Sequence, residues 1–218
     1  MKGRLITFEG GEGCGKSTQI RLLADRLKSL CHKVREVREP GGTPLGEKIR
    51  DLLKHDPAGR GMAPEAELLL MNASRAQLVR EVVRPALDAG EIVLCDRFFD
   101  STVAYQSGGR GLSRESVDAV IDQAVGSTRP DLTLLLSVSG DEALRRVAAR
   151  SAAAPALEDR FEQEKQAFFD RVEAAYAALA AAEPDRIRVV AAEGDPAGVA
   201  ERVWQVVKDV LPPILGPA

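Results

Sequence analysis

The stretch Gly10-Gly11-Glu12-Gly13-Cys14-Gly15-Lys16-Ser17-Thr18 decides the fold prediction for this chain. It fits the pattern G-x-x-x-x-G-K-[ST], in which two glycines, the lysine and the hydroxyl residue hold fixed positions. Residues 4–9 before it are mostly apolar, aromatic or β-branched, which predicts a buried strand, and residues 19–27 after it carry apolar side chains at helical spacing. A strand, a glycine-rich turn and a helix are the setting in which this pattern binds phosphate groups.

The chemistry of such a loop follows from its glycines and from the helix that it opens. Glycine lets successive backbone N–H groups curl around an anion, and the helix N-terminus adds partial positive charge. We expect Lys16 to reach the β- and γ-phosphates of ATP and the Ser17 hydroxyl to ligate Mg²⁺. The alternative is a glycine-rich turn that matches by chance. The predicted ATP-binding residues are Gly10, Gly11, Glu12, Gly13, Cys14, Gly15, Lys16, Ser17 and Thr18.

Length and charge bound the class of protein. The 218 residues suit one α/β domain, which we place at residues 1–211, followed by a loosely ordered tail at 212–218. A net charge of −3 does not favour nucleic acid or an anionic membrane as a partner. Three cysteines without metal-ligand spacing favour a reducing compartment. The first strand begins within a few residues and no apolar run is long enough to span a membrane, so we expect a cytoplasmic protein.

Short apolar segments alternate with helical patterns along the rest of the chain. Strands are predicted at residues 33–37, 92–95, 132–138 and 187–191, and helices at residues 45–53, 64–90, 100–106, 141–150, 158–182 and 195–210, with a further helix capped by Ser113. The alanines and the proline at residues 151–155 should break the chain between two helices. This alternation predicts a doubly wound five-stranded parallel sheet with helices on both faces, and with ligands at the C-terminal ends of the strands.

Two charged residues follow the predicted strand 92–95. Asp96 stands where phosphate-loop proteins carry the acid that organises Mg²⁺, directly or through water; the alternative is a helix cap. Guanidinium groups bind phosphate through paired hydrogen bonds, so several arginines around Arg97 would indicate a second anionic substrate. Each arginine alone is more often a solvated surface residue. The candidates to converge with Arg97 are Arg38, Arg50 and Arg75.

Arginines also flank the alanine- and proline-rich break. They predict a mobile lid that closes over the transferring phosphates and excludes water; an exposed loop with charged helix ends is the alternative. Tyr105 and Gln106 lie beside a glycine loop, where they are able to read a base or a sugar by hydrogen bonding. The arginines are Arg145, Arg146, Arg150 and Arg160.

Taken together, the motifs resemble one family. They are Phe8-Glu9-Gly10, Arg38-Glu39-Pro40-Gly41-Gly42-Thr43, Ala73-Ser74-Arg75, Asp96-Arg97-Phe98, Ser101-Thr102-Val103-Ala104-Tyr105-Gln106, Gly109-Arg110-Gly111, Arg129-Pro130-Asp131-Leu132-Thr133 and Glu158-Asp159-Arg160-Phe161-Glu162. In this order, and over nearly the whole chain, they are similar to the bacterial thymidylate kinases of the phosphate-loop nucleoside monophosphate kinase superfamily.

The resemblance implies transfer of the ATP γ-phosphoryl group to dTMP, with Mg²⁺, in a homodimer. It also implies a lid at about residues 146–160. It implies that Arg97 and Arg50 face the dTMP phosphate, that Arg75 reaches the thymine, and that Tyr105 disfavours a ribose 2′-hydroxyl. The implied dTMP-binding residues are Glu39, Pro40, Arg50, Met71, Ser74, Arg75, Arg97, Ser101, Thr102, Tyr105 and Gln106, and the implied catalytic residues are Glu12, Lys16, Arg97 and Arg150.

The sequence departs from the family at two places. Met71 occupies a position where members often have a phenylalanine stacked on thymine, and a thioether offers no ring face. Members with an acidic residue in the phosphate loop, as Glu12 is here, often have an arginine-rich lid. This lid is alanine-rich, and Arg146, Arg150 and Arg160 are the nearby candidates to stabilise the transition state.

Two other functions fit the phosphate loop itself. One is a kinase of the same fold that acts on a different nucleotide. The other is a nucleotide-dependent switch or assembly ATPase that acts on protein partners. The sequence holds no N-K-x-D motif for reading guanine. Phosphoryl transfer is mostly positioning and charge neutralisation, so neither a nucleophilic side chain nor a strong general base is expected.

Overall fold

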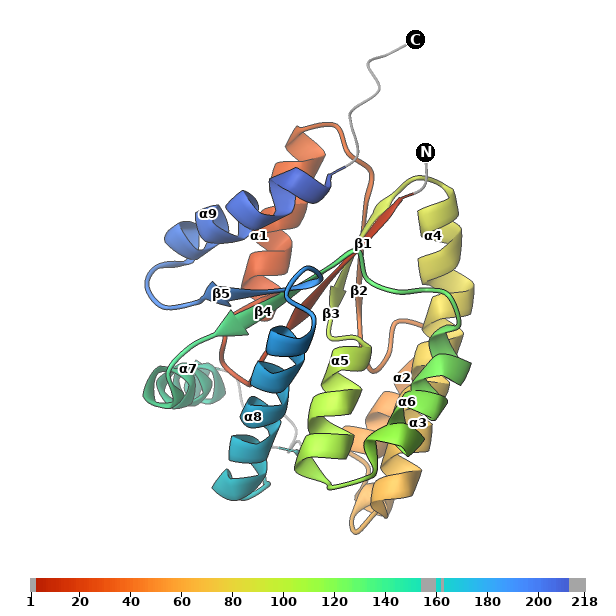
Figure 1. The fold of residues 1–218 in the computed structure, drawn as a ribbon. Helices are drawn as coiled ribbons and strands as arrows, with labels where there is room; N and C mark the ends of the chain where they lie inside the picture. The colour runs from red at the N-terminus through yellow and green to blue at the C-terminus, as the bar shows by residue number, and fades with distance from the viewer. Residues whose placement is uncertain (1–2, 154–159, 162, 212–218) are drawn as a thin grey trace.

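Five parallel strands form one sheet in the computed structural model, which describes residues 3–153, 160–161 and 163–211 (Figure 1). The strands are β1 (Arg4–Glu9), β2 (Val34–Arg38), β3 (Ile92–Asp96), β4 (Leu132–Ser137) and β5 (Ile187–Ala191). Their order across the sheet is β2-β3-β1-β4-β5. The order reverses direction at β1, so this strand and its neighbours β3 and β4 border the crevice in which such sheets bind ligands. The predicted doubly wound five-stranded sheet is confirmed.

Helices cover both faces of the sheet. They are α1 (Lys16–Ser29), α2 (Pro44–Lys54), α3 (Pro64–Leu78), α4 (Arg84–Asp88), α5 (Phe99–Thr102), α6 (Arg114–Val125), α7 (Gly140–Ala153), α8 (Gln166–Ala182) and α9 (Pro196–Val207). Short 3₁₀ turns lie at Pro57–Gly59 and Lys208–Val210, and π turns at Val79–Val83 and Val103–Gly109. Figure 1 shows α1 and α9 on one side of the sheet and α5, α6 and α8 on the other. Every helix of the described chain is too short or too polar to cross a bilayer.

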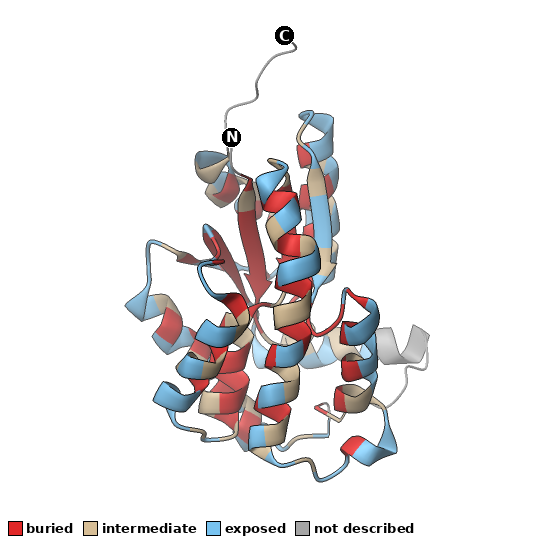
Figure 2. Ribbon diagram, turned by 90° about the vertical axis from the view of Figure 1, so that its right-hand side faces the viewer, coloured by how far each residue is buried: buried red, intermediate tan, exposed pale blue. Residues whose placement is uncertain are grey.

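The central strands are buried on both faces because their side chains alternate between two cores. Leu5 of β1 packs with α3, α6 and α8, whereas Ile6 and Phe8 pack with α1 and α9. Val93 and Leu94 of β3 divide between the cores in the same way. Figure 2 shows these strands as buried ribbon between the two helical layers. A strand buried on both sides needs continuous apolar sequence, which explains the run at residues 92–95.

Side-chain caps begin three of the α-helices. The side chains of Thr43, Ser113 and Asp195 accept hydrogen bonds from the first turns of α2, α6 and α9. The residue before α1 is Gly15, which has φ 94° and supplies no side-chain cap. The first N–H groups of α1 are therefore left for a ligand.

The helix predicted over 64–90 is present as α3, the π turn Val79–Val83 and α4, and it ends at Asp88. The π turn lies just before Pro85, which lacks the N–H that would continue the regular hydrogen-bond pattern. Two other expected boundaries were wrong. The break predicted at 151–155 does not begin at Ser151, since α7 continues through Ala153 with residues of good helix propensity. The helix predicted over 158–182 begins only at Gln166. The predictions for residues 154–159, for the Arg150 side chain and for the tail 212–218 lie outside what the structure describes.

Candidate active site

The phosphate loop joins the C-terminal end of β1 to the N-terminus of α1. Gly10, Gly13 and Gly15 adopt positive φ values of 131°, 73° and 94°, which other residues rarely adopt. A Cβ atom at Gly13 would lie 2.5 Å from the backbone oxygen of Ala143, so α7 packs directly on the loop. The loop is therefore fixed from outside, while its N–H groups and the start of α1 form a cradle for an anion.

Lys16 lies over this cradle and is almost fully buried. Its Nζ donates to the backbone oxygens of Gly10 at 3.1 Å and Gly11 at 2.8 Å, and to the Cys14 sulfur at 3.4 Å. These acceptors are neutral and weaker partners than an ionised phosphate oxygen. The ammonium group thus lies at the place where phosphates would bind, on bonds that a phosphate can replace.

Ser17 and Asp96 meet at the edge of the loop. The Ser17 hydroxyl donates to Asp96 Oδ2 at 2.9 Å, although 79 residues separate them in the chain. Within the described ranges no group of three or more His, Cys, Asp or Glu side chains could hold a metal ion. A Mg²⁺ ion does not need such a group, because it usually takes one or two protein oxygens and completes its shell with water and substrate phosphate. The hydroxyl and carboxylate pair fits that requirement.

Arg97 follows Asp96 and points between the loop and a second cavity. Its backbone has φ 66°, an uncommon value for a side-chain-bearing residue and one that collects at functional sites. The guanidinium contacts Glu12, Tyr105 and Tyr176 at 3.3 Å and the Ser101 hydroxyl at 3.1 Å. These contacts are long and mostly to neutral oxygens, so this arginine can turn to an incoming phosphate without leaving a buried anion unpaired.

Arg75 is held very differently. Its Nε and Nη2 donate to Glu39 Oε2 at 2.8 and 2.7 Å, and Nη1 donates to Asn72 and Thr102. Nη2 also donates its second hydrogen to the Phe98 carbonyl oxygen at 3.2 Å. The two side chains of the ion pair are 3% and 4% exposed, so this is a buried, saturated charge pair.

Glu39 keeps one unused group in this pair. Its Oε1 is buried and has no hydrogen-bond partner among the described residues. Burial raises the pKa of Glu39 above its usual value, although the charge and hydrogen bonds of Arg75 oppose the shift. A buried acceptor without a donor, on the wall of a cavity, is a group that a ligand donor would satisfy.

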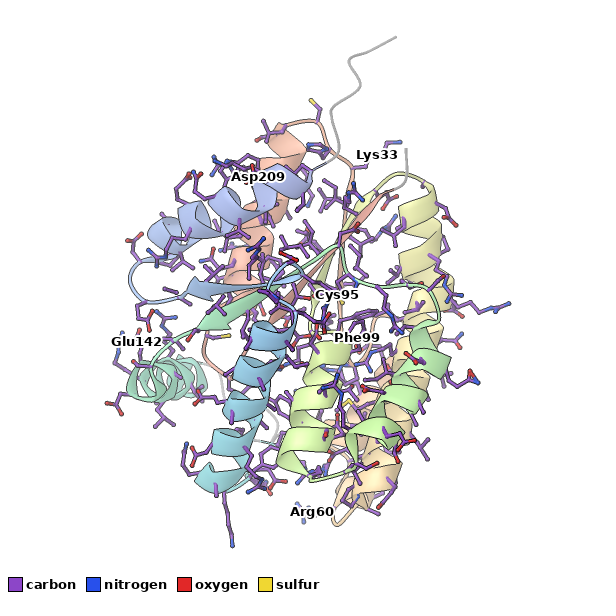
Figure 3. All side chains as sticks on the ribbon, in the orientation of Figure 1. Lys33, Arg60, Cys95, Phe99, Glu142 and Asp209 are labelled. Atoms are coloured by element: carbon purple, nitrogen blue, oxygen red, sulfur yellow. The ribbon has the colours of Figure 1, made fainter. Side chains whose placement is uncertain are left out.

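The second cavity lies next to the phosphate loop, between α3 and α5. Most of its walls are the predicted acceptor residues. They are Glu12, Glu39, Pro40, Met71, Arg75, Arg97, Ser101, Thr102, Tyr105 and Gln106, joined by Lys54 and Phe161. The residues that follow β1, β2 and β3 converge here, because the carboxyl ends of parallel strands lie at one edge of the sheet. The first turn of α5 lies at the same edge. Figure 3 shows Cys95, at the end of β3, and Phe99, at the start of α5, near the centre of the molecule.

Three of the predicted residues stand behind the cavity wall rather than on it. Arg50 donates to the Pro40 carbonyl oxygen, and the buried Ser74 hydroxyl accepts the Gly41 N–H. Both hold the loop that carries Pro40. Arg38 pairs with Glu47, so the expectation that it converges with Arg97 was wrong. Its strand end points it toward the start of α2, which sequence spacing did not reveal.

Glu9 was noted only as a motif residue, yet it organises the start of α5. Its two carboxylate oxygens accept from the Phe98 N–H at 2.7 Å, from the Ser101 hydroxyl at 2.6 Å and from the Tyr176 hydroxyl at 2.8 Å. Burial, with the nearby charge of Asp100, raises the pKa of Glu9 to about 7. A charged residue inside an otherwise apolar strand was the available signal, and its partners on α5 and α8 were invisible in the sequence.

The arginines of the predicted lid lie in different places. Arg146 donates to Glu142 and to the Ala192 carbonyl oxygen, and it borders a cavity that also touches the first turn of α1 and the loop before α9. Arg145 pairs with Glu142 and is 75% exposed. Arg160 is bound to α2 and α3 and does not line either loop-side cavity. The cavity beside Arg146 was not predicted, since it needs the loop 192–196 folded back onto the phosphate loop.

The comparisons with known proteins agree with this geometry. The family model described as "Thymidylate kinase" matches residues 8–203. The thymidylate kinase of Syntrophotalea carbinolica is 49% identical over 207 residues, which are 94% of this chain and 95% of that protein. The enzyme of Pseudomonas syringae pv. tomato is 48% identical over 211 residues, which are 97% and 98% of the two chains. The crystal structure of thymidylate kinase from Ehrlichia chaffeensis aligns with a TM-score of 0.76 at 30% identity and covers 95% of this chain and 100% of that chain. A cradle for a phosphate donor, an adjoining arginine-walled pocket and these matches place the chain in the thymidylate kinase family.

Proposed function

We propose that the protein transfers the γ-phosphoryl group of ATP to dTMP, giving ADP and dTDP, as a step in dTTP synthesis. The observation that carries the proposal is the junction between the two cavities. Arg97 Nη2 lies 3.3 Å from Glu12 of the phosphate loop, and the same guanidinium borders the acceptor pocket. Arg97 thus lies at the end of the acceptor pocket that adjoins the phosphate loop, where it would hold the acceptor phosphate next to the donor.

The donor site is the loop at residues 10–18 with Lys16. The ammonium group leaves the Gly10 and Gly11 carbonyl oxygens and binds β- and γ-phosphate oxygens, whose negative charge it neutralises. Ser17 and Asp96 would hold a Mg²⁺ ion, which would neutralise phosphate charge during the transfer. The cavity beside Arg146 takes the nucleoside end of ATP, because it adjoins the first turn of α1.

The acceptor site presents dTMP with its phosphate toward Arg97 and its base between the walls formed by Met71, Arg75 and Gln106. An oxygen of the dTMP phosphate forms a bond to the γ-phosphorus while the bond to the bridging oxygen breaks, and that electron pair leaves with ADP. The attacking oxygen is already anionic, so no side chain has to remove a proton. Arg97, Lys16 and Glu12 act by position and charge.

Residues 1–211 form one kinase domain with a lid at about residues 146–160. We propose that Arg150 of the lid stabilises the transferring phosphoryl group. Closure of a lid over the two cavities that flank the loop would exclude water before transfer. Arg150→Ala should lower kcat more than either KM, and unchanged kcat would remove Arg150 from the mechanism.

The test of the function is an ADP-release assay with dTMP, dUMP, dCMP, dGMP and dAMP as acceptors, at fixed ATP and Mg²⁺. We expect the highest kcat/KM with dTMP. Equal rates with all five acceptors would contradict the proposal. Preference for a different nucleotide would assign the chain to that substrate. ADP release that needs no acceptor would favour a switch ATPase.

The same proposal includes a homodimer in the cytoplasm. Its support is the family resemblance, which implies a dimer through the longer helices. Leu69 on α3 is 58% exposed, although a single exposed leucine does not by itself mark an interface. Sedimentation equilibrium at micromolar concentration should give twice the mass of the chain, and a monomer would contradict the dimer.

A further inference from the structure

Glu67 is a fully buried carboxylate that belongs to neither the phosphate loop nor the cavity wall. It lies on α3 one turn before Met71 and is 0% exposed. Burial alone would raise the pKa of Glu67, but hydrogen bonds and the charges of Arg110 and Arg160 hold the pKa below its usual value. The side chain is therefore a buried anion, and its two cations come from distant parts of the chain.

Four hydrogen bonds converge on this carboxylate. Arg110 donates to both oxygens at 3.0 Å, Arg160 donates to Oε2 at 2.6 Å, and the Gln106 amide donates to Oε1 at 2.9 Å. The donors belong to the turn Val103–Gly109, to the residue after it and to the segment before α8. Glu67 thus joins α3 to the turn and to the segment before α8, and Arg110 adds a second link between the last two through its ion pair with Glu164.

Gln106 connects this cluster to the acceptor pocket. It is 1% exposed and lines the pocket. A carboxylate oxygen can only accept, so Glu67 fixes the Gln106 amide with its NH₂ group toward α3. The position and the orientation of a pocket-lining amide therefore depend on a residue behind it.

Arg160 connects the cluster to a second wall. Its backbone N–H donates to the Lys54 carbonyl oxygen and its Nε to the Leu53 carbonyl oxygen, both at 3.0 Å, which ties it to the end of α2. Phe161 follows, 8% exposed, and its ring meets the edge of Tyr105 at 6.1 Å between centroids. The Arg160 guanidinium lies 4.6 Å from the centre of the Phe161 ring. The ion pair with Glu67 therefore sets where this ring closes the pocket.

We propose that Glu67 is a positioning residue of the acceptor pocket, which places Gln106 directly and Phe161 through Arg160. The inference rests on the proposed function, because it needs dTMP in this pocket. It also gives Arg160 a role different from that of a lid arginine at the transition state. A positioning role predicts a change of KM for dTMP, whereas a transition-state role predicts a change of kcat.

The test compares Glu67→Gln and Arg160→Gln in steady-state kinetics with dTMP and ATP. Both variants should raise KM for dTMP about tenfold, while kcat and KM for ATP stay within about twofold, because only the pocket walls move. The double variant should raise KM for dTMP by no more than about twofold beyond Glu67→Gln, because both single variants already lose the ion pair between Glu67 and Arg160. A merely structural role would lower the melting temperature without this separation of the two KM values.

Glu91→Gln is the matched control. Glu91 forms a two-bond ion pair with Arg35 at the opposite end of β3, so its loss should leave both KM values unchanged. An unchanged dTMP KM in both test variants would overturn the inference, as would a fall in kcat of a hundredfold for Arg160→Gln at constant KM. If Glu67→Gln does not fold, Arg160→Gln alone decides. Failure of the wild-type protein to prefer dTMP would instead refute the proposed function.

Discussion

The phosphate loop and the acceptor pocket lie side by side but hold their cations in opposite ways. In the loop, Lys16 is bound to backbone oxygens and one sulfur, all of them neutral. In the pocket, Arg75 gives every donor to a buried partner and forms a complete ion pair with Glu39. Arg97 stands between the two and has the looser contacts of the loop.

This difference in cation partners predicts that the loop contributes mainly to turnover, whereas the pocket also contributes to stability. A cation on neutral acceptors can change partners when ATP arrives, so the loop should matter for turnover and little for folding. A buried ion pair leaves an uncompensated charge when one member is lost, so the pocket should matter for stability as well. Four variants test this division, from the largest expected effect to the smallest.

Replacing Lys16 should have the largest effect. Lys16→Ala removes the loop cation, and we expect kcat/KM to fall by about 10³-fold, as for loss of a single charge-stabilising donor. The free energy of unfolding should change by no more than about 1 kcal/mol, measured by urea denaturation. Lys28→Ala, which breaks an exposed pair with Glu36, is the control and should keep full activity. Retained turnover in Lys16→Ala would end the assignment of the loop.

Glu39→Gln tests the contribution of the pocket ion pair to stability. It leaves Arg75 charged and buried without a counter-charge, and the free energy of unfolding should fall by about 3–5 kcal/mol. Glu47→Gln removes the exposed partner of Arg38 and should cost at most about 1 kcal/mol. Urea unfolding curves of the two variants and the wild type measure both values. Equal losses would mean that the pocket pair is no more important than a surface pair.

The pH dependence of stability should carry the signature of Glu9. Its pKa is about 7 in the folded protein and about 4.3 in an unfolded chain, so between these values only the folded state keeps the proton. The free energy of unfolding should therefore fall as pH rises from about 4.3 to 7, by at most about 4 kcal/mol, and level off above pH 7.

Glu9→Gln cannot ionise and should lack this fall. Urea unfolding at pH 5, 6, 7 and 8 gives the difference between the variant and the wild type, which cancels the contribution of other carboxylates. The difference should shift in favour of the variant as pH rises. Parallel curves would show that Glu9 does not titrate in this range.

Met71 should give the smallest effect. It is partly buried on the pocket wall, where a ring would stack on a base. Met71→Phe should lower KM for dTMP by about two- to tenfold, since an aromatic pair adds about 0.5–1.5 kcal/mol. Met71→Leu keeps the size without a ring and should leave KM for dTMP within about twofold. A rise of KM in Met71→Phe would show that the ring does not fit between α3 and the base.

The fold and the donor site followed from sequence because their signals are local. The loop is one stretch whose glycines and flanking strand determine its shape, and the alternation of strands and helices determines the sheet. The break predicted at 151–155 was placed too early at its start, because alanine continues a helix readily and α7 runs through Ala153. The start of α8 was predicted too early, at residue 158 instead of Gln166. Arg160 is bound to Glu67 on α3, and this tertiary contact overrides the local helical pattern.

The acceptor pocket was predicted as a set of residues but not as a structure. Family motifs named Arg75 and Gln106, yet which donors they use depends on α3, α5 and the turn after it meeting in space. The roles of Glu9, Glu67 and Tyr176 appeared only with the structure, because their partners lie 89, 93 and 167 residues away in the chain. Charged or polar residues inside apolar patterns were the signal that each of them offered.

Calorimetric titration of two ligands into two variants tests the division most directly. dTMP and a non-hydrolysable ATP analogue are titrated separately into Lys16→Ala and Arg97→Ala, and the dissociation constants are compared with the wild type. We predict that Lys16→Ala loses at least tenfold in analogue affinity and keeps dTMP affinity within about twofold, while Arg97→Ala shows the reverse. Loss of dTMP binding in Lys16→Ala, or equal loss of both ligands in Arg97→Ala, would contradict two adjoining sites that use separate cations.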